Sequence, residues 1–121
     1  MDSRKLALHT RKLADDRKAE DIVILDVRKL SSVTDYFVIA SVLSDPHLKA
    51  VVDEVEGGIQ KDLGLRVFAM DGTAAAGWVV LDFFDVIVHV MRRDTREHYN
   101  LEGLWNDAPQ VRARGASRSA R

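Results

Sequence analysis

Residues 78–91 read WVVLDFFDVIVHVM, and this stretch predicts a β-hairpin. Two runs of β-branched and aromatic residues, Trp78–Phe83 and Val86–Met91, are separated by only Phe84 and Asp85. So short a connection favours a two-residue turn. The turn sets the register, because it places Phe83 opposite Val86 and carries the pairing on to Trp78 opposite Met91. The residues on each face of the hairpin can therefore be named.

One face of this predicted hairpin is wholly apolar and the other is mixed. The apolar face, which we expect in the core, consists of Val79, Leu81, Phe83, Val86, Val88 and Val90. The mixed face consists of Trp78, Val80, Asp82, Ile87, His89 and Met91. An aromatic anchor beside a thioether and fixed polar groups is typical of protein interfaces. If helices cover both faces of the sheet, the same residues instead form a second core layer, and the pattern favours the two interpretations about equally.

The rest of the chain supplies three predicted helices and three more strands. The clearest helix has apolar residues at helical spacing from Leu48 to Leu63, begins at Ser44 or Asp45, and ends at Gly64. The other predicted helices span about Ser3–Lys18 and Leu101–Asn106, and the strands span Ile22–Val27, Tyr36–Ser41 and Arg66–Met70, with a small-residue loop over 71–77 and a charged stretch over 92–100. Five strands and three helices in this order predict an α/β (α+β) domain with a mixed five-stranded sheet.

The charge distribution divides the chain into a body, residues 1–109, and a tail, residues 110–121. The chain has 18 Lys and Arg against 19 Asp and Glu, and 4 of the arginines, with no acid, lie in the tail. The body therefore holds 14 basic and 19 acidic residues, a net charge of −5. Such a body suits a basic protein partner better than specific contact with nucleic acid. The basic tail is predicted to be disordered, with solubilisation favoured over nonspecific contact with RNA phosphates.

Composition and spacing disfavour most kinds of catalytic chemistry. The chain has no cysteine, its histidines lack metal-ligand spacing, and it has no glycine-rich phosphate loop. We therefore expect no catalytic residue, metal or other cofactor. Asp35, Asp82 and Asp85 lie near strand ends, where paired carboxylates could hold magnesium for phosphoryl transfer, but an ordinary role as turn and strand-end acids is favoured by roughly ten to one. No apolar stretch is long enough for a secretion signal or a membrane span, so we expect a cytoplasmic protein.

Three blocks of the sequence carry a family resemblance. They are AEDIVILDVRKLSSVTDYFVIAS (19–41), WVVLDFFDVIVHV (78–90) and REHYNLEGLW (96–105). In this order and at these distances they resemble the bacterial ribosomal silencing factor family, also called Iojap-like proteins, over about residues 6–108. The resemblance implies a mixed sheet flanked by helices, with a topology similar to that of nucleotidyltransferases but without their active site.

The resemblance also implies a function as a translational repressor. A protein of this family is expected to bind the large ribosomal subunit through ribosomal protein L-fourteen and to block association with the small subunit when nutrients are limiting. The docking region carries over to Trp78, Asp82 and His89, and the register adds Val80 and Met91. The family also implies a homodimer, whose formation would compete with docking. The alternative is a phosphoryl-transfer enzyme of nucleotidyltransferase type that uses Asp82 and Asp85.

The chain departs from the family pattern at two glycine positions, where it has Val42 and Phe84. Glycine readily adopts the positive φ that a hairpin turn needs, so a bulge or a longer loop at Phe84 would shift the register. The start of the second helix also differs, because the sequence SDPH (44–47) replaces a Ser-x-Arg pattern. Because the register at Phe84 decides which residues share a face of the hairpin, the predicted site depends on the conformation of this turn.

Overall fold

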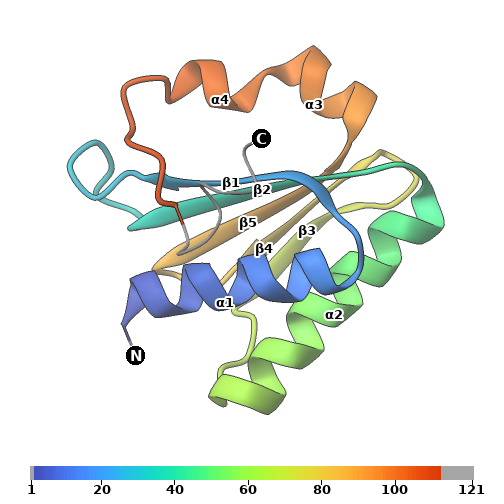
Figure 1. Ribbon diagram of the computed structural model, residues 1–121, viewed down its shortest axis with the longest axis horizontal. Helices are drawn as coiled ribbons and strands as arrows, with labels where there is room; N and C mark the ends of the chain where they lie inside the picture. Colours follow the sequence, from blue (N-terminus) through green and yellow to red (C-terminus); the bar gives the residue numbers. More distant parts are fainter. Residues whose placement is uncertain (1, 113–121) are drawn as a thin grey trace.

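The protein forms a five-stranded sheet with helices on both faces (Figure 1). The computed structural model describes residues 2–112. The elements in chain order are α1 (Ser3–Asp16), β1 (Glu20–Asp26), β2 (Tyr36–Val42), α2 (Asp45–Leu63), β3 (Ala69–Thr73), β4 (Trp78–Asp82), β5 (Val86–Arg92), α3 (Arg93–Tyr99) and α4 (Leu101–Leu104). The predicted α/β (α+β) class with a mixed five-stranded sheet is confirmed. The nucleotidyltransferase-like topology stays a prediction.

The sheet has the strand order β1-β2-β5-β4-β3. Neighbouring strands β2 and β5 run parallel, and the other neighbours run antiparallel. Helices α1 and α2 cover one face of the sheet (Figure 1), where they bury the main core. The apolar face of the hairpin belongs to this core as predicted: Val79, Leu81, Phe83, Val86, Val88 and Val90.

The predicted boundaries of α2 are confirmed by its caps. The Ser44 side chain accepts a hydrogen bond from the His47 amide, and Gly64 ends the helix at φ 71°. Inside the helix, Gly58 lies against α1, because a Cβ at this position would come within 2.7 Å of Leu13. Close packing of the two helices therefore explains this glycine.

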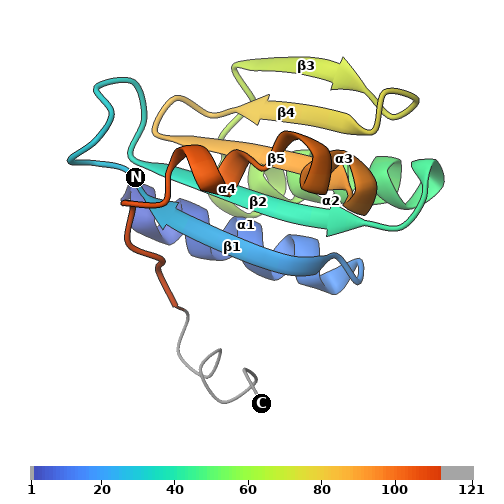
Figure 2. The same ribbon diagram turned by 90° about the horizontal axis from the view of Figure 1, so that it is seen from above.

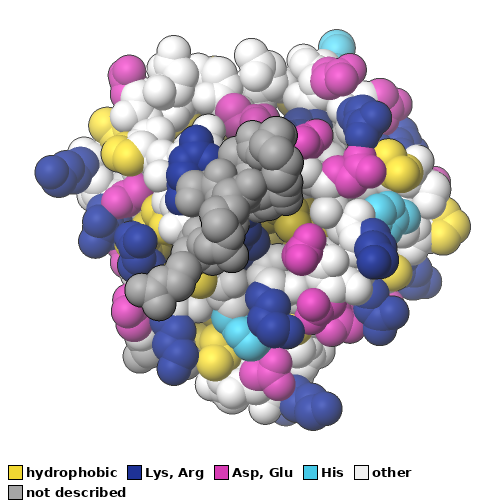
Figure 3. All heavy atoms as spheres, in the orientation of Figure 1, with side chains coloured by type: hydrophobic (Ala, Val, Ile, Leu, Met, Phe, Trp, Pro, Cys, Tyr) yellow, Lys and Arg dark blue, Asp and Glu magenta, His cyan; other side chains and the backbone are white. Residues whose placement is uncertain are grey.

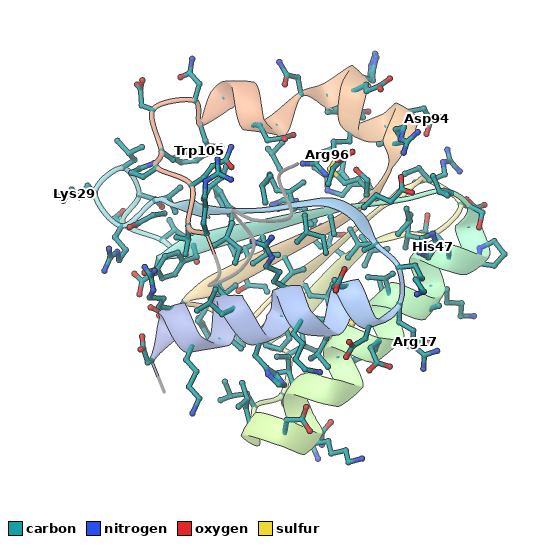
Figure 4. The ribbon with its side chains drawn as sticks, in the orientation of Figure 1. Arg17, Lys29, His47, Asp94, Arg96 and Trp105 are labelled. Atoms are coloured by element: carbon teal, nitrogen blue, oxygen red, sulfur yellow. The ribbon has the colours of Figure 1, made fainter. Side chains whose placement is uncertain are left out.

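His47 ties the start of α2 to the end of α1. Its Nδ1 accepts a hydrogen bond from the Leu43 amide at 3.1 Å, and its Nε2 lies 2.8 Å from the Arg17 carbonyl oxygen. Figure 4 shows His47 and Arg17 on the same side of the molecule. Since Nδ1 accepts, Nε2 is the nitrogen that donates.

The β4–β5 hairpin has the predicted register, with Trp78 opposite Met91 and Asp82 opposite Ile87. Phe84 occupies the left-handed region at φ 70°, so the turn closes without glycine and the register is not shifted. The Asp82 carboxylate accepts a hydrogen bond from the Phe84 amide at 2.7 Å. This contact helps to hold a conformation that is strained for an aromatic residue.

The third strand differs from the prediction. We predicted a strand over Arg66–Met70, whereas β3 spans Ala69–Thr73 and forms an exposed edge of the sheet. The reason is the tight turn over 74–77, after which antiparallel pairing with β3 begins at Trp78. The predicted loop over 71–77 therefore begins too early, because residues 71–73 belong to β3.

The charged stretch 92–100 contains a helix, α3, that was not predicted, and the predicted helix Leu101–Asn106 is shorter than expected. The contacts of Arg96 explain α3. Its buried guanidinium donates hydrogen bonds to the Glu102 carboxylate, the Asp21 carbonyl and the Ser41 hydroxyl. A charged segment lacks the apolar spacing that predicts a helix, so these tertiary contacts are what stabilise it.

The packed part of the chain extends past the predicted boundary at residue 109. The Asp26 amide donates to the Pro109 carbonyl, and the Val111 amide donates to the Ile24 carbonyl, each at 2.8 Å. The Val111 side chain is buried in the main core. The predicted boundary is therefore too early, because the segment around Gln110 pairs with the edge of β1. The predicted disorder of the tail from residue 113 onward lies outside the described residues.

Candidate functional site

Helices α3 and α4 cover only part of the second face of the sheet. Figure 2 shows them over β5 and β2, whereas β4 and β3 carry no helix on this side. A second apolar cluster fills the covered part: it consists of Leu25, Val27, Phe37, Ile39, Met91 and Ala108, with Val23, Trp78, Ile87, Leu101 and Trp105 packed against it. The mixed face of the hairpin is thus divided into a buried half and an open half.

Met91 and His89 lie in the buried half. Met91 is 0% exposed and His89 is 8% exposed. Strand β5 is central in the sheet, and the α3–α4 segment covers this side of it. Met91 therefore offers no surface to a partner, and its place in the predicted set is corrected: it is a residue of the second core layer.

The open half is formed by β4, β3 and the end of α3. We define the open surface as Asp71 and Thr73 of β3, Trp78, Val80 and Asp82 of β4, and Tyr99 of α3. All six residues are partly or fully exposed. The prediction missed Asp71 and Thr73, because it placed them in a loop. Side-chain alternation along β3 would have identified both residues once the pairing with β4 was known.

Trp78 forms one wall of a hollow on the open surface. The hollow has a volume of about 350 Å³ and is lined by Asp71, Gly72, Ala76, Trp78, Val80 and Tyr99. The indole Nε1 of Trp78 donates a hydrogen bond to His89 Nδ1 at 3.1 Å. On its other side the indole packs against Tyr99, with ring centroids 4.9 Å apart. The indole is therefore held by two neighbours while part of it remains accessible.

The imidazole of His89 is neutral at physiological pH. Burial lowers the pKa of His89 to about 4, because desolvation disfavours the charged ring. The indole nitrogen of Trp78 can only donate, so Nδ1 of His89 is the unprotonated nitrogen and Nε2 carries the hydrogen. This part of the site is a neutral pair of rings joined by a directional hydrogen bond.

Asp82 and Asp85 have structural contacts at the hairpin turn. The Asp82 carboxylate accepts from the Phe84 amide, and the Asp85 carbonyl accepts from the amides of Asp35 and Tyr36 at 2.9 and 3.2 Å. No cluster of three or more His, Asp or Glu side chains in residues 2–112 is arranged to hold a metal ion. The Asp82 contact fits the ordinary role of an acid beside a turn, whereas Asp85 contributes its backbone carbonyl.

The open surface carries negative charge beside apolar side chains. Asp71 and Asp82 are its charged members, and Val80 lies opposite the first of them. Elsewhere, on the face seen in Figure 3, basic and acidic side chains are interspersed. The open surface therefore combines an aromatic anchor with two carboxylates, an arrangement that suits a basic partner.

Comparison with known proteins gives consistent matches in sequence and in fold. A family model described as "Ribosomal silencing factor during starvation" matches residues 1–121. Ribosomal silencing factor RsfS of Bacillus subtilis is 44% identical over 95 residues, which cover 78% of this chain and 80% of that protein. The chloroplastic protein Iojap of Arabidopsis thaliana is 33% identical over 110 residues, which cover 91% of this chain and 45% of that protein.

The fold also has a close match among solved structures. A crystal structure of a protein from Chromobacterium violaceum has a TM-score of 0.83 and 30% sequence identity, and the match covers 88% of each chain. This match supports the described fold, and the family is shown by the sequence matches.

Proposed function

This chain belongs to the ribosomal silencing factor family, which includes Iojap, and we propose that it docks on ribosomal protein L-fourteen of the large ribosomal subunit and blocks joining of the small subunit. The proposed contact is the open surface, with Trp78 as its apolar anchor. One observation carries this proposal: the part of the second sheet face that α3 and α4 leave uncovered presents a fixed, partly exposed tryptophan.

The composition of the open surface supports a basic protein as the partner. A tryptophan can bury on the order of 200 Å² in an interface, which makes Trp78 suitable as a hot spot. Asp71 and Asp82 supply negative charge at the same place. A ribosomal protein that binds RNA carries positive charge, so complementary potentials would speed the encounter.

The same acidic character supports protein contact rather than specific contact with nucleic acid. Residues 1–109 have a net charge of −5, from 14 basic and 19 acidic residues. Binding to nucleic acid depends on neutralising phosphates with Lys and Arg. In this proposal the folded body therefore reaches the ribosome through a protein.

Two further expectations belong to this proposal. A homodimer that used the open surface would hide Trp78, so self-association and docking would compete. A protein that acts on ribosomes has to share their compartment, which supports the expected cytoplasmic location. In residues 2–112, none of the helices is long and apolar enough to cross a membrane.

The family consists of ribosome-silencing factors and not of enzymes. The Asp82 carboxylate accepts from the Phe84 amide at the turn, which favours a structural role for this acid over the phosphoryl-transfer alternative through Asp82 and Asp85. We therefore put forward no second function.

The proposal is tested by co-sedimentation of the full chain with purified large subunits, followed by a subunit-joining assay. Trp78→Ala is expected to weaken binding by about 30-fold or more, as for an interface hot spot, and to restore subunit joining. Val33→Ala is the matched control, because Val33 is an exposed apolar residue on the loop between β1 and β2. The melting temperature of each variant shows that it is folded at the assay temperature.

Two results would contradict the proposal. A folded Trp78→Ala variant that binds large subunits as tightly as the parent would remove the open surface from the contact. Binding to large subunits without binding to purified ribosomal protein L-fourteen would assign the contact to another component.

A further inference from the structure

We propose that His89 is a positioning residue for Trp78: the buried imidazole accepts the indole N–H and holds the indole in its docking orientation without itself contacting the partner. This inference rests on the proposed function of the open surface. It also revises the role that the resemblance implied for His89, which was that of a docking contact.

The two side chains meet across the β4–β5 hairpin. Trp78 lies opposite Met91 and His89 lies opposite Val80, so the two residues are diagonal neighbours on the same face. The indole Nε1 is 3.1 Å from His89 Nδ1, and the ring centroids are 5.9 Å apart. The hydrogen bond thus joins a buried ring to a partly exposed ring.

Aromatic side chains of the second core layer also hold the imidazole in place. Phe37 of β2 meets His89 edge-on, with centroids 5.6 Å apart, and Trp105 meets Phe37 in the same manner at 5.0 Å. Figure 4 shows Trp105 in the layer between α4 and the sheet. A side chain that is fixed by packing presents its acceptor nitrogen in one direction. The position of the indole is therefore set by the second core layer.

The hydrogen bond matters for docking because it reduces the cost of ordering Trp78. Immobilising a side chain in an interface costs about 0.5–1.5 kcal/mol, which corresponds to about a two- to tenfold change in affinity. With His89 in place, the indole is already ordered in the free protein, so docking does not incur this cost. Without an acceptor, the indole N–H would turn toward water, and only packing against Tyr99 and the second apolar cluster would hold the ring.

Two substitutions at His89 separate the acceptor from the packing. In His89→Asn the side-chain oxygen lies about as far along the side chain as Nδ1 and can accept the indole N–H. In His89→Leu the apolar volume is retained but the acceptor is lost. A merely structural role would make Asn, which is polar and smaller, at least as harmful as Leu. A positioning role makes Asn the better replacement.

The first readout is the indole N–H resonance of Trp78 in a proton–nitrogen NMR spectrum, assigned with Trp78→Phe. We expect His89→Leu to move this resonance to the position of a water-exposed indole, and His89→Asn to leave it shifted as in the parent. The second readout is affinity for large subunits, which we expect to fall about fivefold in His89→Leu and less than twofold in His89→Asn.

A third measurement uses the parent protein and needs no variant. The ring nitrogens of His89 are expected to show an unprotonated Nδ1 and a protonated Nε2 in a long-range proton–nitrogen spectrum. The reverse assignment would overturn the proposal, as would an unchanged indole resonance in His89→Leu, or equal affinities of the two variants. Failure of the parent to bind large subunits would contradict the proposed function, whereas the indole and imidazole resonances decide the positioning of Trp78 separately.

Discussion

The guanidinium of Arg96 in α3 forms a bidentate ion pair with the carboxylate of Glu102 in α4, with N–O distances of 3.0 and 2.8 Å. Arg96 is 8% exposed and also donates to the Asp21 carbonyl and the Ser41 hydroxyl. This one side chain therefore joins α3 and α4 to β1 and β2. Tyr99, which packs against Trp78, lies at the end of the same helix.

Arg96→Ala is expected to lower the free energy of unfolding by about 3 kcal/mol, because it leaves the buried Ser41 hydroxyl and the partly buried Asp21 carbonyl without their donor and removes the partner of Glu102. Arg96→Lys keeps the charge but loses the bidentate geometry, so we expect a smaller loss. Urea unfolding measures both values. A loss below about 0.5 kcal/mol in Arg96→Ala would show that the junction does not depend on this residue.

Asp82 accepts a hydrogen bond at the turn and adds negative charge to the open surface, and substitution can separate these two roles. Asp82→Asn keeps an oxygen that can accept from the Phe84 amide but removes the charge, whereas Asp82→Lys removes both. We expect Asp82→Asn to retain the parent melting temperature and to slow association with large subunits at low salt, with the difference disappearing at high salt. Association rates measured at several salt concentrations check this. An unchanged rate at low salt would exclude Asp82 from the electrostatic contribution.

Phe84 lies at φ 70° on the exposed tip of the hairpin. Both Phe84→Gly and Phe84→Ala remove its ring contact with Phe68, whose centroid is 4.1 Å away. Glycine alone also relieves the left-handed strain. We therefore expect Phe84→Gly to be more stable than Phe84→Ala by about 1 kcal/mol in urea unfolding. Equal stabilities would mean that the turn is not strained at this position.

Stability is expected to fall between pH 6.5 and pH 4 because of His89. Its pKa is lowered from 6.5 to about 4 in the folded state by burial, so the unfolded chain binds the proton more readily. The contribution of the neutral ring is fully present above pH 6.5 and is lost as the pH falls toward 4, by about 3 kcal/mol in total. Unfolding of the parent and of His89→Asn at a series of pH values measures it. The difference between the two proteins should vary with pH, and a constant difference would refute the assignment.

The adjacent glycines of α2 allow a matched pair of alanine substitutions that tests the packing of α2 against α1. A Cβ at Gly57 would meet nothing within 4 Å, whereas a Cβ at Gly58 would lie 2.7 Å from Leu13. We expect Gly57→Ala to stabilise the protein by about 1 kcal/mol through helix propensity. In Gly58→Ala, overpacking against α1 offsets this gain, so its melting temperature should be the lower of the two. The reverse order would show that α1 moves to accept the side chain.

Local patterns in the sequence determined the hairpin and α2. The two-residue connection between Phe83 and Val86 set a register that the structure confirms, even though Phe84 has to adopt a positive φ. The apolar spacing, the serine cap and Gly64 set the bounds of α2. These features depend on neighbours close in sequence, and so the residue types alone are sufficient.

The tertiary structure alone decided which parts of the second sheet face are covered. A period of two shows that Trp78, His89 and Met91 share a face, but it does not show what packs on that face. The cover is α3 and α4, and α3 is stabilised by contacts of Arg96 with groups as far away in sequence as Asp21. Because such contacts leave no periodic pattern in the sequence, His89 and Met91 could not be separated from Trp78 until the chain was folded.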